Sequence, residues 1–193
     1  MEVLLAVDRA LFVFFNQGVR NWLFDETLPF LTDINQRPIG MVILALAWLL
    51  LLTRGGRPGR IAALLLIPTI ALSDQLNSSF LKFIIDRPRP CLELSNVHLL
   101  VGCGSGYSFP SSHAVNNFAA ATVLSYFLPR QAWAFFCFAG VMAFSRIYVG
   151  VHYPSDVLAG SIIGLGVGFS VIFVFRRIEE WWRRRKSLKA ASL

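Results

Sequence analysis

Charged residues are scarce in this chain, and their scarcity excludes an ordinary soluble domain. Only 15% of the 193 residues are charged, whereas 55% are hydrophobic and the mean hydropathy is +0.59. A soluble domain carries about a quarter charged residues. The apolar residues also gather in long runs. The composition therefore predicts an integral membrane protein whose length, residues 1–193, corresponds to a single domain.

The N-terminal residues do not predict a cleavable signal peptide. The first residues, MEVLLAVDRALFVFFNQ, carry Asp8 and Arg9 inside their apolar stretch and have no small-residue cleavage site. No internal repeat or low-complexity linker is present either. Insertion is therefore expected to depend on the membrane segments themselves.

The long apolar runs predict an all-α fold, an integral membrane helical bundle. Five segments approach the ~20 residues needed to cross ~30 Å of hydrocarbon, and they lie at about 38–53, 60–81, 113–128, 131–150 and 155–176. The N-terminal stretch at about 3–16 is apolar but short, so we expect an interfacial helix, with a sixth membrane helix as the alternative. The domain then divides into an N-terminal segment, a transmembrane core and a basic tail, at 1–35, 36–176 and 177–193.

The basic residues predict the orientation. Seven of the eighteen lie between Arg176 and Lys189, three in the loop 54–60 and one at Arg130, all on one side of the five-helix arrangement. The positive-inside rule makes that side, and the C-terminus, cytoplasmic. A net charge of +7 in a soluble protein would suggest nucleic acid. Because the cations flank membrane segments, we expect contact with the bilayer and no nucleic-acid partner.

Two cysteines fall in the polar loop 91–112, on the outer side of this arrangement. Cys91 and Cys103 are twelve residues apart, whereas Cys137 lies in a membrane segment. An oxidising compartment would allow the first two to form a disulfide, and two unpaired thiols are the alternative.

Pro110 to His113, read PSSH, begins the 113–128 helix. Free N–H groups and the helix dipole make a helix N-terminus suited to an anion. Ser111 and Ser112 add hydroxyl donors, and His113 is placed to give a proton to a leaving oxygen. A simple serine N-cap beside an unrelated histidine is the alternative.

Ser145 to Asp156 contains a second histidine. His152 precedes Asp156 by four residues, so the carboxylate can orient one ring nitrogen and leave the other free to attack. Arg146 can hold phosphate oxygens in a planar fork. The alternative is an interfacial ion pair between Arg146 and Asp156 with a structural His152.

Lys82 to Pro90 provides further cations. Lys82 ends a membrane segment, and Arg89-Pro90 follows after six residues. Proline makes this stretch extended, which could bring Arg89 and Lys82 to one anion. Arg87 is a second candidate, ranked below Arg89, with Asp86 as a candidate partner. Cations snorkelling at a membrane edge are the alternative.

These three segments resemble the signature of the type 2 phosphatidic acid phosphatase family, also called lipid phosphate phosphatases. That signature is a lysine, six residues and Arg-Pro, then Pro-Ser-Gly-His, then Ser-Arg, five residues, His, three residues and Asp. The first and third parts match at every position, and the second departs only at Ser112, where glycine is usual. The resemblance covers roughly residues 70–170.

The resemblance implies a role for each matched residue. His152 would be the nucleophile that forms a phosphohistidine, Asp156 would orient it, and His113 would be the general acid. The phosphoryl group would be bound by Lys82, Arg89, Arg146, Ser111 and Ser112. No metal or other cofactor is expected, because three cations replace a metal and too few carboxylates lie near for magnesium.

The implied enzyme is a small bacterial lipid phosphatase of the cytoplasmic (inner) membrane, with its site facing the periplasm. Its partner is a membrane lipid phosphate monoester or diphosphate, and undecaprenyl diphosphate or lipid A 1-phosphate is favoured. Phosphatidylglycerophosphate, phosphatidic acid and a lipid-to-lipid phosphotransferase are alternatives. An anion-binding membrane scaffold or transporter is the non-enzyme alternative. Nothing in the sequence indicates an oligomeric state.

Overall fold

The computed structural model describes residues 2–77 and 85–191, and every regular element in these ranges is a helix. The N-terminal part holds α1 (Glu2–Val13), a short π-helix η1 (Phe14–Gly18) and α2 (Trp22–Thr32). The longer helices are α3 (Pro38–Arg54), α4 (Gly56–Leu76), α7 (Ser112–Phe127), α8 (Ala132–Tyr148) and α9 (Pro154–Ala191). Two short helices, α6 (Pro90–Glu93) and the 3₁₀ helix η3 (Pro129–Gln131), complete the set.

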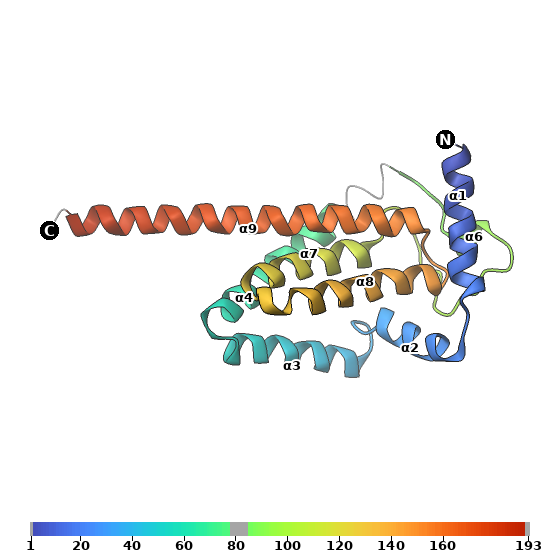
Figure 1. Ribbon diagram of the computed structural model, residues 1–193, viewed down its shortest axis with the longest axis horizontal. Helices are drawn as coiled ribbons and strands as arrows, with labels where there is room; N and C mark the ends of the chain where they lie inside the picture. Colours follow the sequence, from blue (N-terminus) through green and yellow to red (C-terminus); the bar gives the residue numbers. More distant parts are fainter. Residues whose placement is uncertain (1, 78–84, 192–193) are drawn as a thin grey trace.

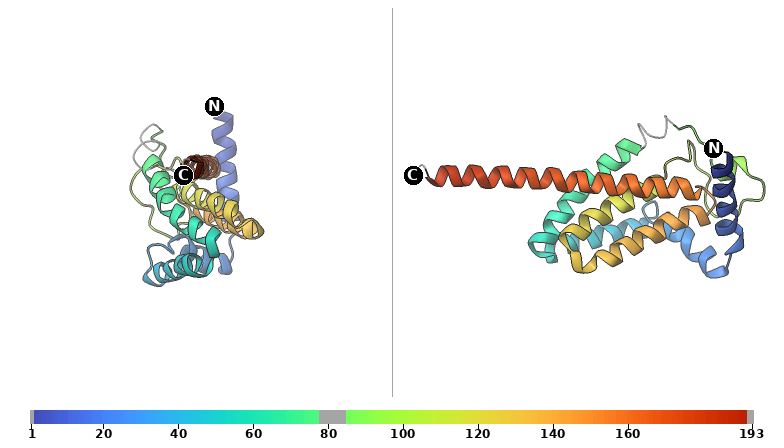
Figure 2. Two further views of the ribbon diagram at one scale, coloured as in Figure 1. Left: turned by 90° about the vertical axis from the view of Figure 1, so that its left-hand side faces the viewer. Right: turned by 45° about the horizontal axis from the view of Figure 1, so that its top comes forward.

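Helix α7 is the centre of the bundle, in contact with α4, α8 and α9, while α3 covers α4. Figure 2 shows α7 and α8 on one side of α9, with α4 crossing it obliquely. The N-terminus of α7, the C-terminus of α8 and the first turn of α9 therefore meet at one end of the bundle, which we call the site end. Helix α1 crosses this end beside the start of α9 instead of running along the bundle (Figure 1).

Glycines let α9 approach α7 closely. A Cβ atom on Gly160, Gly164 or Gly168 would lie 2.7 Å from the Ser111 carbonyl oxygen, 2.4 Å from the Val115 carbonyl oxygen and 2.5 Å from Thr122 Cβ, respectively. These glycines are four residues apart, so they form one stripe along α9, as in closely packed membrane helices. The stripe sets the distance between the start of α7 and the start of α9.

The outer surface of the bundle is apolar, as a lipid-facing surface must be. Two described helices, Gly56–Leu76 and the stretch Pro154–Leu188, are long and apolar enough to cross a membrane, and α3 is a shorter apolar helix. Large apolar side chains are more than half exposed at Leu46, Leu50, Ile67, Leu158, Ile162, Phe169 and Phe173.

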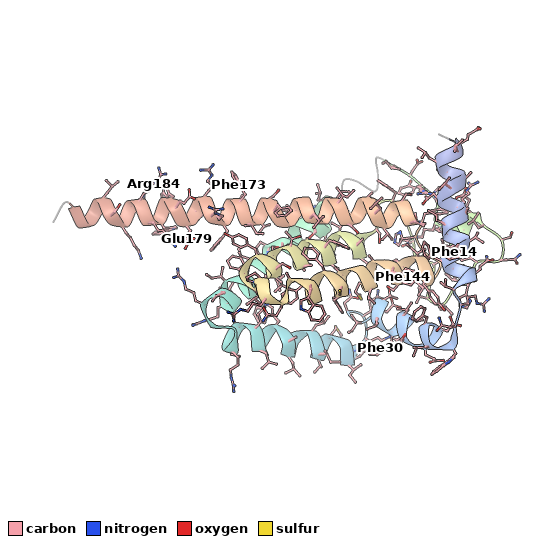
Figure 3. The ribbon with its side chains drawn as sticks, in the orientation of Figure 1. Phe14, Phe30, Phe144, Phe173, Glu179 and Arg184 are labelled. Atoms are coloured by element: carbon pink, nitrogen blue, oxygen red, sulfur yellow. A yellow bond between two sulfur atoms is a disulfide. The ribbon has the colours of Figure 1, made fainter. Side chains whose placement is uncertain are left out.

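The predicted segments 38–53, 113–128 and 131–150 agree with α3, α7 and α8 to within two residues at either end. The prediction for the last segment is wrong in length, because α9 continues well beyond 176 and takes in the basic tail. Phe173, Glu179 and Arg184 lie on the part of α9 that approaches and passes the other end of the bundle (Figure 3). Helical charge pairs such as Glu179 with Arg183, at 2.8 Å, support this extension.

Aromatic rings attach the N-terminal part to α8. The Phe144 ring lies 5.7 Å from that of Phe15 and 6.5 Å from that of Phe24, and Tyr148 lies 5.6 Å from Phe24. Phe14 and Phe144 mark this corner in Figure 3. Edge-to-face ring pairs of this kind add to the burial of apolar area. They bring α2, and with it Thr32, to the site end.

Candidate active site

The structure brings four of the predicted site residues together in a buried cluster. Arg89, Arg146, His152 and Asp156 are each at most 7% exposed, although they come from three separate stretches of chain. Ser111 joins them, because its backbone N–H donates to the Asp156 carbonyl oxygen at 3.1 Å. Lys82, the remaining predicted cation, lies outside the described residues.

The two ring nitrogens of His152 have different surroundings. Nδ1 lies 3.4 Å from Ser108 Oγ and 3.7 Å from Asp156 Oδ2. Ser108 donates its only proton to Asp156 Oδ2 at 2.5 Å, so toward Nδ1 it can only accept. Nδ1 therefore carries the proton of the neutral ring. Nε2, with its lone pair, lies 3.4 Å from a guanidinium nitrogen of Arg89.

Burial keeps the His152 ring neutral. It lowers the pKa of His152 from 6.5 to about 4, and nearby Arg146 and Arg89 act in the same direction, while the hydrogen bond with Asp156 opposes it. A neutral imidazole has the free lone pair that a nucleophile needs. At neutral pH, this site therefore holds an uncharged histidine facing an arginine.

The carboxylate of Asp156 accepts three hydrogen bonds. Its Oδ2 accepts from Ser108 and from the Tyr153 backbone N–H, at 2.5 and 2.8 Å, and its Oδ1 accepts from Arg87 at 2.8 Å. Because Asp156 follows Pro154 in the first turn of α9, the helix dipole also favours its negative charge. The carboxylate is fully buried and tightly positioned one turn from His152.

Arg89 is aimed at His152 by backbone carbonyls. Its Nε donates to Gly106 at 3.2 Å and its terminal nitrogen to Val151 at 3.3 Å. The loop that carries Gly106 is attached close to Arg89 by a disulfide between Cys91 and Cys103, with their Cα atoms 6.1 Å apart. The predicted disulfide is therefore present.

Arg146 has an unsatisfied donor. Its terminal nitrogen donates to Thr32 Oγ1 at 2.7 Å and lies 3.7 Å from Asp33 Oδ1, so its acidic partner among the described residues is Asp33 and not Asp156. Its Nε and the hydroxyl of Ser111 are buried without a hydrogen-bond partner among the described residues. Buried polar atoms are rarely left in this state. Two such donors in one cluster point to an anion as the missing partner.

His113 and Ser112 lie on the side of the cluster nearest α4. The Thr32 carbonyl can only accept, so His113 Nε2 carries a proton and donates it over 3.0 Å. Ser112 Oγ accepts from Asn77 Nδ2 at 2.6 Å. Both residues are positioned at the start of α7, but Ser112 is engaged with α4.

A cavity of about 800 Å³ opens beside these two residues. It extends along α7 from Ser112 to Ala120, about 12 Å at 1.5 Å per residue. Asn35, Asp74, Asn116 and Asn117 add polar groups to its lining, and the rest of the wall is mostly apolar, with Leu44, Trp48, Leu66, Ile67, Ile70, Phe138 and Met142. This shape suits a molecule with a polar head and an apolar tail.

Sequence reasoning missed several contributors. Arg87 does not pair with Asp86 as predicted: it bridges Asp156 and Asp8, at 2.8 and 2.6 Å. Thr32 and Ser108 had no distinguishing local signal, although Ser108 lies two residues before the PSSH segment. Gly166 of α9 differs from Gly160, Gly164 and Gly168, because a Cβ atom there would meet open space, so it takes no part in the close packing of α9 on α7.

The site therefore presents a positioned neutral histidine, a fixed carboxylate, buried arginines and an apolar cavity, which together define a class of site suited to phosphoryl transfer from a lipid. Residues 62–180 match the PAP2 superfamily. The chain belongs to this superfamily of membrane lipid phosphatases.

Similar proteins agree with this assignment. The chain is 31% identical over 192 residues to a lipid A 4'-phosphatase of Porphyromonas gingivalis, which covers 94% of this chain and 78% of that protein. It is 28% identical over 186 residues to a lipid A 4'-phosphatase of Bacteroides thetaiotaomicron, covering 92% of this chain and 81% of that protein. The crystal structure of Aquifex aeolicus LpxE superposes with a TM-score of 0.71 at 30% identity, covering 86% and 94% of the two chains.

Proposed function

We propose that this chain is a metal-independent phosphatase that removes phosphate from a membrane lipid through a phosphohistidine on His152. One observation carries the proposal: Nδ1 of His152 lies against Ser108 and Asp156 while Nε2 faces Arg89, an arrangement that favours the tautomer with its free lone pair on Nε2. This is the geometry of a nucleophile paired with an orienting carboxylate.

In the first step, Nε2 attacks phosphorus and the bond between phosphorus and the lipid oxygen breaks. The departing oxygen takes a proton from His113, which acts in its doubly protonated, cationic form, exchanges its bond to the Thr32 carbonyl for this transfer and becomes neutral. In the second step, neutral His113 removes a proton from water, the water oxygen attacks phosphorus, and the bond from phosphorus to Nε2 breaks. Inorganic phosphate leaves and His152 returns to its neutral form.

Three cations stabilise the phosphoryl oxygens in this scheme. Arg89 lies beside Nε2, Arg146 has an Nε without a hydrogen-bond partner in the described part of the chain, and Lys82 is assigned from its spacing to Arg89. The Ser111 hydroxyl, which likewise has no partner in residues 2–77 and 85–191, and the amide groups at the start of α7 add neutral donors, with Ser112 beside them. Donors placed in advance around a developing negative charge supply much of the catalysis in such reactions.

The favoured substrate is a phosphate on a lipid A-type glycolipid. The two lipid A 4'-phosphatases match over nearly the whole chain. An undecaprenyl-diphosphatase of Bacillus subtilis is 26% identical over 77% of this chain, which keeps an isoprenoid diphosphate as the second candidate. In either case the apolar tail would lie in the cavity between α3, α4, α7 and α8. The positive-inside rule favours a site that faces the periplasm.

The test is phosphate release from a panel of lipid phosphates in detergent, with EDTA present. The wild-type protein is expected to release phosphate, and its preferred lipid identifies the substrate. His152→Ala is expected to lose at least about 10³-fold, as removal of a nucleophile does in other covalent mechanisms. The exposed Ser170→Ala, whose hydroxyl bonds only within α9, is a control that should keep full activity. Activity that persists in His152→Ala would disprove the nucleophile assignment, and loss with EDTA would disprove metal independence.

A further inference from the structure

An acidic residue of the N-terminal helix reaches the candidate active site. Asp8 of α1 is 7% exposed, although it lies in an apolar stretch that crosses the site end. Its carboxylate accepts from Arg87 at 2.6 Å, from the Ser155 backbone N–H at 2.9 Å and from the Ser155 hydroxyl at 2.6 Å. These three donors fix the buried Asp8 carboxylate in one position beside the candidate active site.

Arg87 connects Asp8 to the orienting carboxylate. One terminal nitrogen contacts Asp8 Oδ2 and the other contacts Asp156 Oδ1, so a single guanidinium bridges the two acids. The Tyr153 ring lies 3.9 Å from the guanidinium carbon and covers one face of it. With both ends and one face occupied, Arg87 is a spacer of defined length and not a free phosphate ligand.

Asp8 also caps the helix that carries Asp156. The first N–H groups of a helix lack partners within the helix. In α9, the Ser155 N–H is satisfied by Asp8 from another helix, at the residue immediately before Asp156. Asp8 therefore acts on Asp156 twice, through Arg87 and through the first turn of α9.

We propose that Asp8 is a positioning residue for the reaction: α1 docks it against Arg87 and Ser155, and this holds Asp156 at the angle that orients His152. The proposal rests on the phosphohistidine function above. Without the Asp8 charge, Arg87 has only the Asp156 carboxylate as a partner. Asp156 then moves toward Arg87, and the contact between Asp156 and Nδ1 of His152 weakens. Substrate contacts are untouched, because no phosphate-binding residue touches Asp8.

The test compares three variants of α1 and one of Arg87. Asp8→Asn removes the charge with little change in shape, and Asp8→Glu retains it. Arg9→Gln breaks an exposed ion pair from the same helix to Glu93, and so controls for loosened docking of α1. Arg87→Gln removes the connection, and the double variant with Asp8→Asn closes a thermodynamic cycle.

For Asp8→Asn we expect kcat to fall by about 10- to 100-fold, as when a residue that orients a functional side chain is replaced. KM should stay within about twofold of the wild type. Asp8→Glu should recover part of the loss, and Arg9→Gln should stay near the wild type. In the Arg87→Gln background, Asp8→Asn should cost less than about threefold further.

Other outcomes overturn the inference. Unchanged kcat in Asp8→Asn, or an equal loss in Arg9→Gln, means that Asp8 does not position the site. Full additivity in the cycle means that Asp8 does not act through Arg87. If Asp8→Asn does not yield folded protein, Arg87→Gln makes the comparison instead, because it removes the connection and leaves Asp8 in place, and a kcat equal to that of the wild type refutes the inference. Activity in His152→Ala would defeat the proposed function itself, independently of Asp8.

Discussion

The hydroxyl of Ser108 offers a sharp test of how His152 is activated. It donates to Asp156 Oδ2 at 2.5 Å and accepts from His152 Nδ1 at 3.4 Å, and it is fully buried. Ser108→Ala removes both contacts and leaves a methyl group in nearly the same volume. Asp156 keeps the Tyr153 N–H and Arg87, so the carboxylate itself stays charged and in place.

The size of the effect follows from the charge that develops. As Nε2 attacks phosphorus, His152 becomes cationic and its Nδ1–H becomes a stronger donor. A hydrogen bond involving a charged group contributes about 1.5–3 kcal/mol. Since ~1.4 kcal/mol corresponds to a tenfold change in rate, Ser108→Ala should lower kcat by about 10- to 100-fold. KM should change little, because Ser108 has no part in the proposed phosphate binding.

The assay is steady-state phosphate release in detergent, over a range of lipid concentrations on each side of KM. Ser161→Ala is the matched control, because its hydroxyl bonds only to the Val157 carbonyl within α9. The thermal midpoints of both variants should be compared with that of the wild type. A Ser108→Ala enzyme with kcat within twofold of the wild type would refute the proposed orientation of His152. A raised KM at unchanged kcat would instead give Ser108 a role in binding substrate.

Two further predictions concern packing and protonation. Gly164→Ala should lower the free energy of unfolding by about 1–3 kcal/mol, because its Cβ would lie 2.4 Å from the Val115 carbonyl oxygen. Gly166→Ala, with open space around it, is the control and should be neutral or stabilising in thermal unfolding. Equal thermal midpoints for the two variants would contradict the close contact at Gly164. The pKa of His152 in the folded protein, about 4, lies below the ordinary 6.5, so its ring should stay neutral at pH 5.5. Because the unfolded chain binds this proton more readily, the contribution of neutral His152 to stability should be complete above about pH 6.5 and lost as pH falls through about 4. Histidine-selective NMR can follow this, since the chain has only three histidines, and a His152 signal titrating near 6.5 would contradict it.

Much of the site could be predicted because its parts are local in sequence. The His152 and Asp156 pairing depends on one helical turn, and the anion-binding character of Ser111 depends on a helix start. Contacts within one helical turn, or at one helix start, form wherever those helices form, however the helices pack together. Arg87 shows the limit, because the neighbouring Asp86 was the obvious partner in sequence and the real partners come from two other helices.

The sequence by itself determined the class of protein: scarce charge and long apolar runs require helices in a membrane, and three spaced polar segments supply the phosphate chemistry. Only the tertiary structure decided which residues complete the site. Asp8 meets Arg87 across 79 residues, and Thr32 meets Arg146 across 114. No local pattern encodes these contacts, because they depend on how α1 and α2 dock at the site end. The physical reason is that a buried charge must find a partner in space, and the fold alone decides which partner is near.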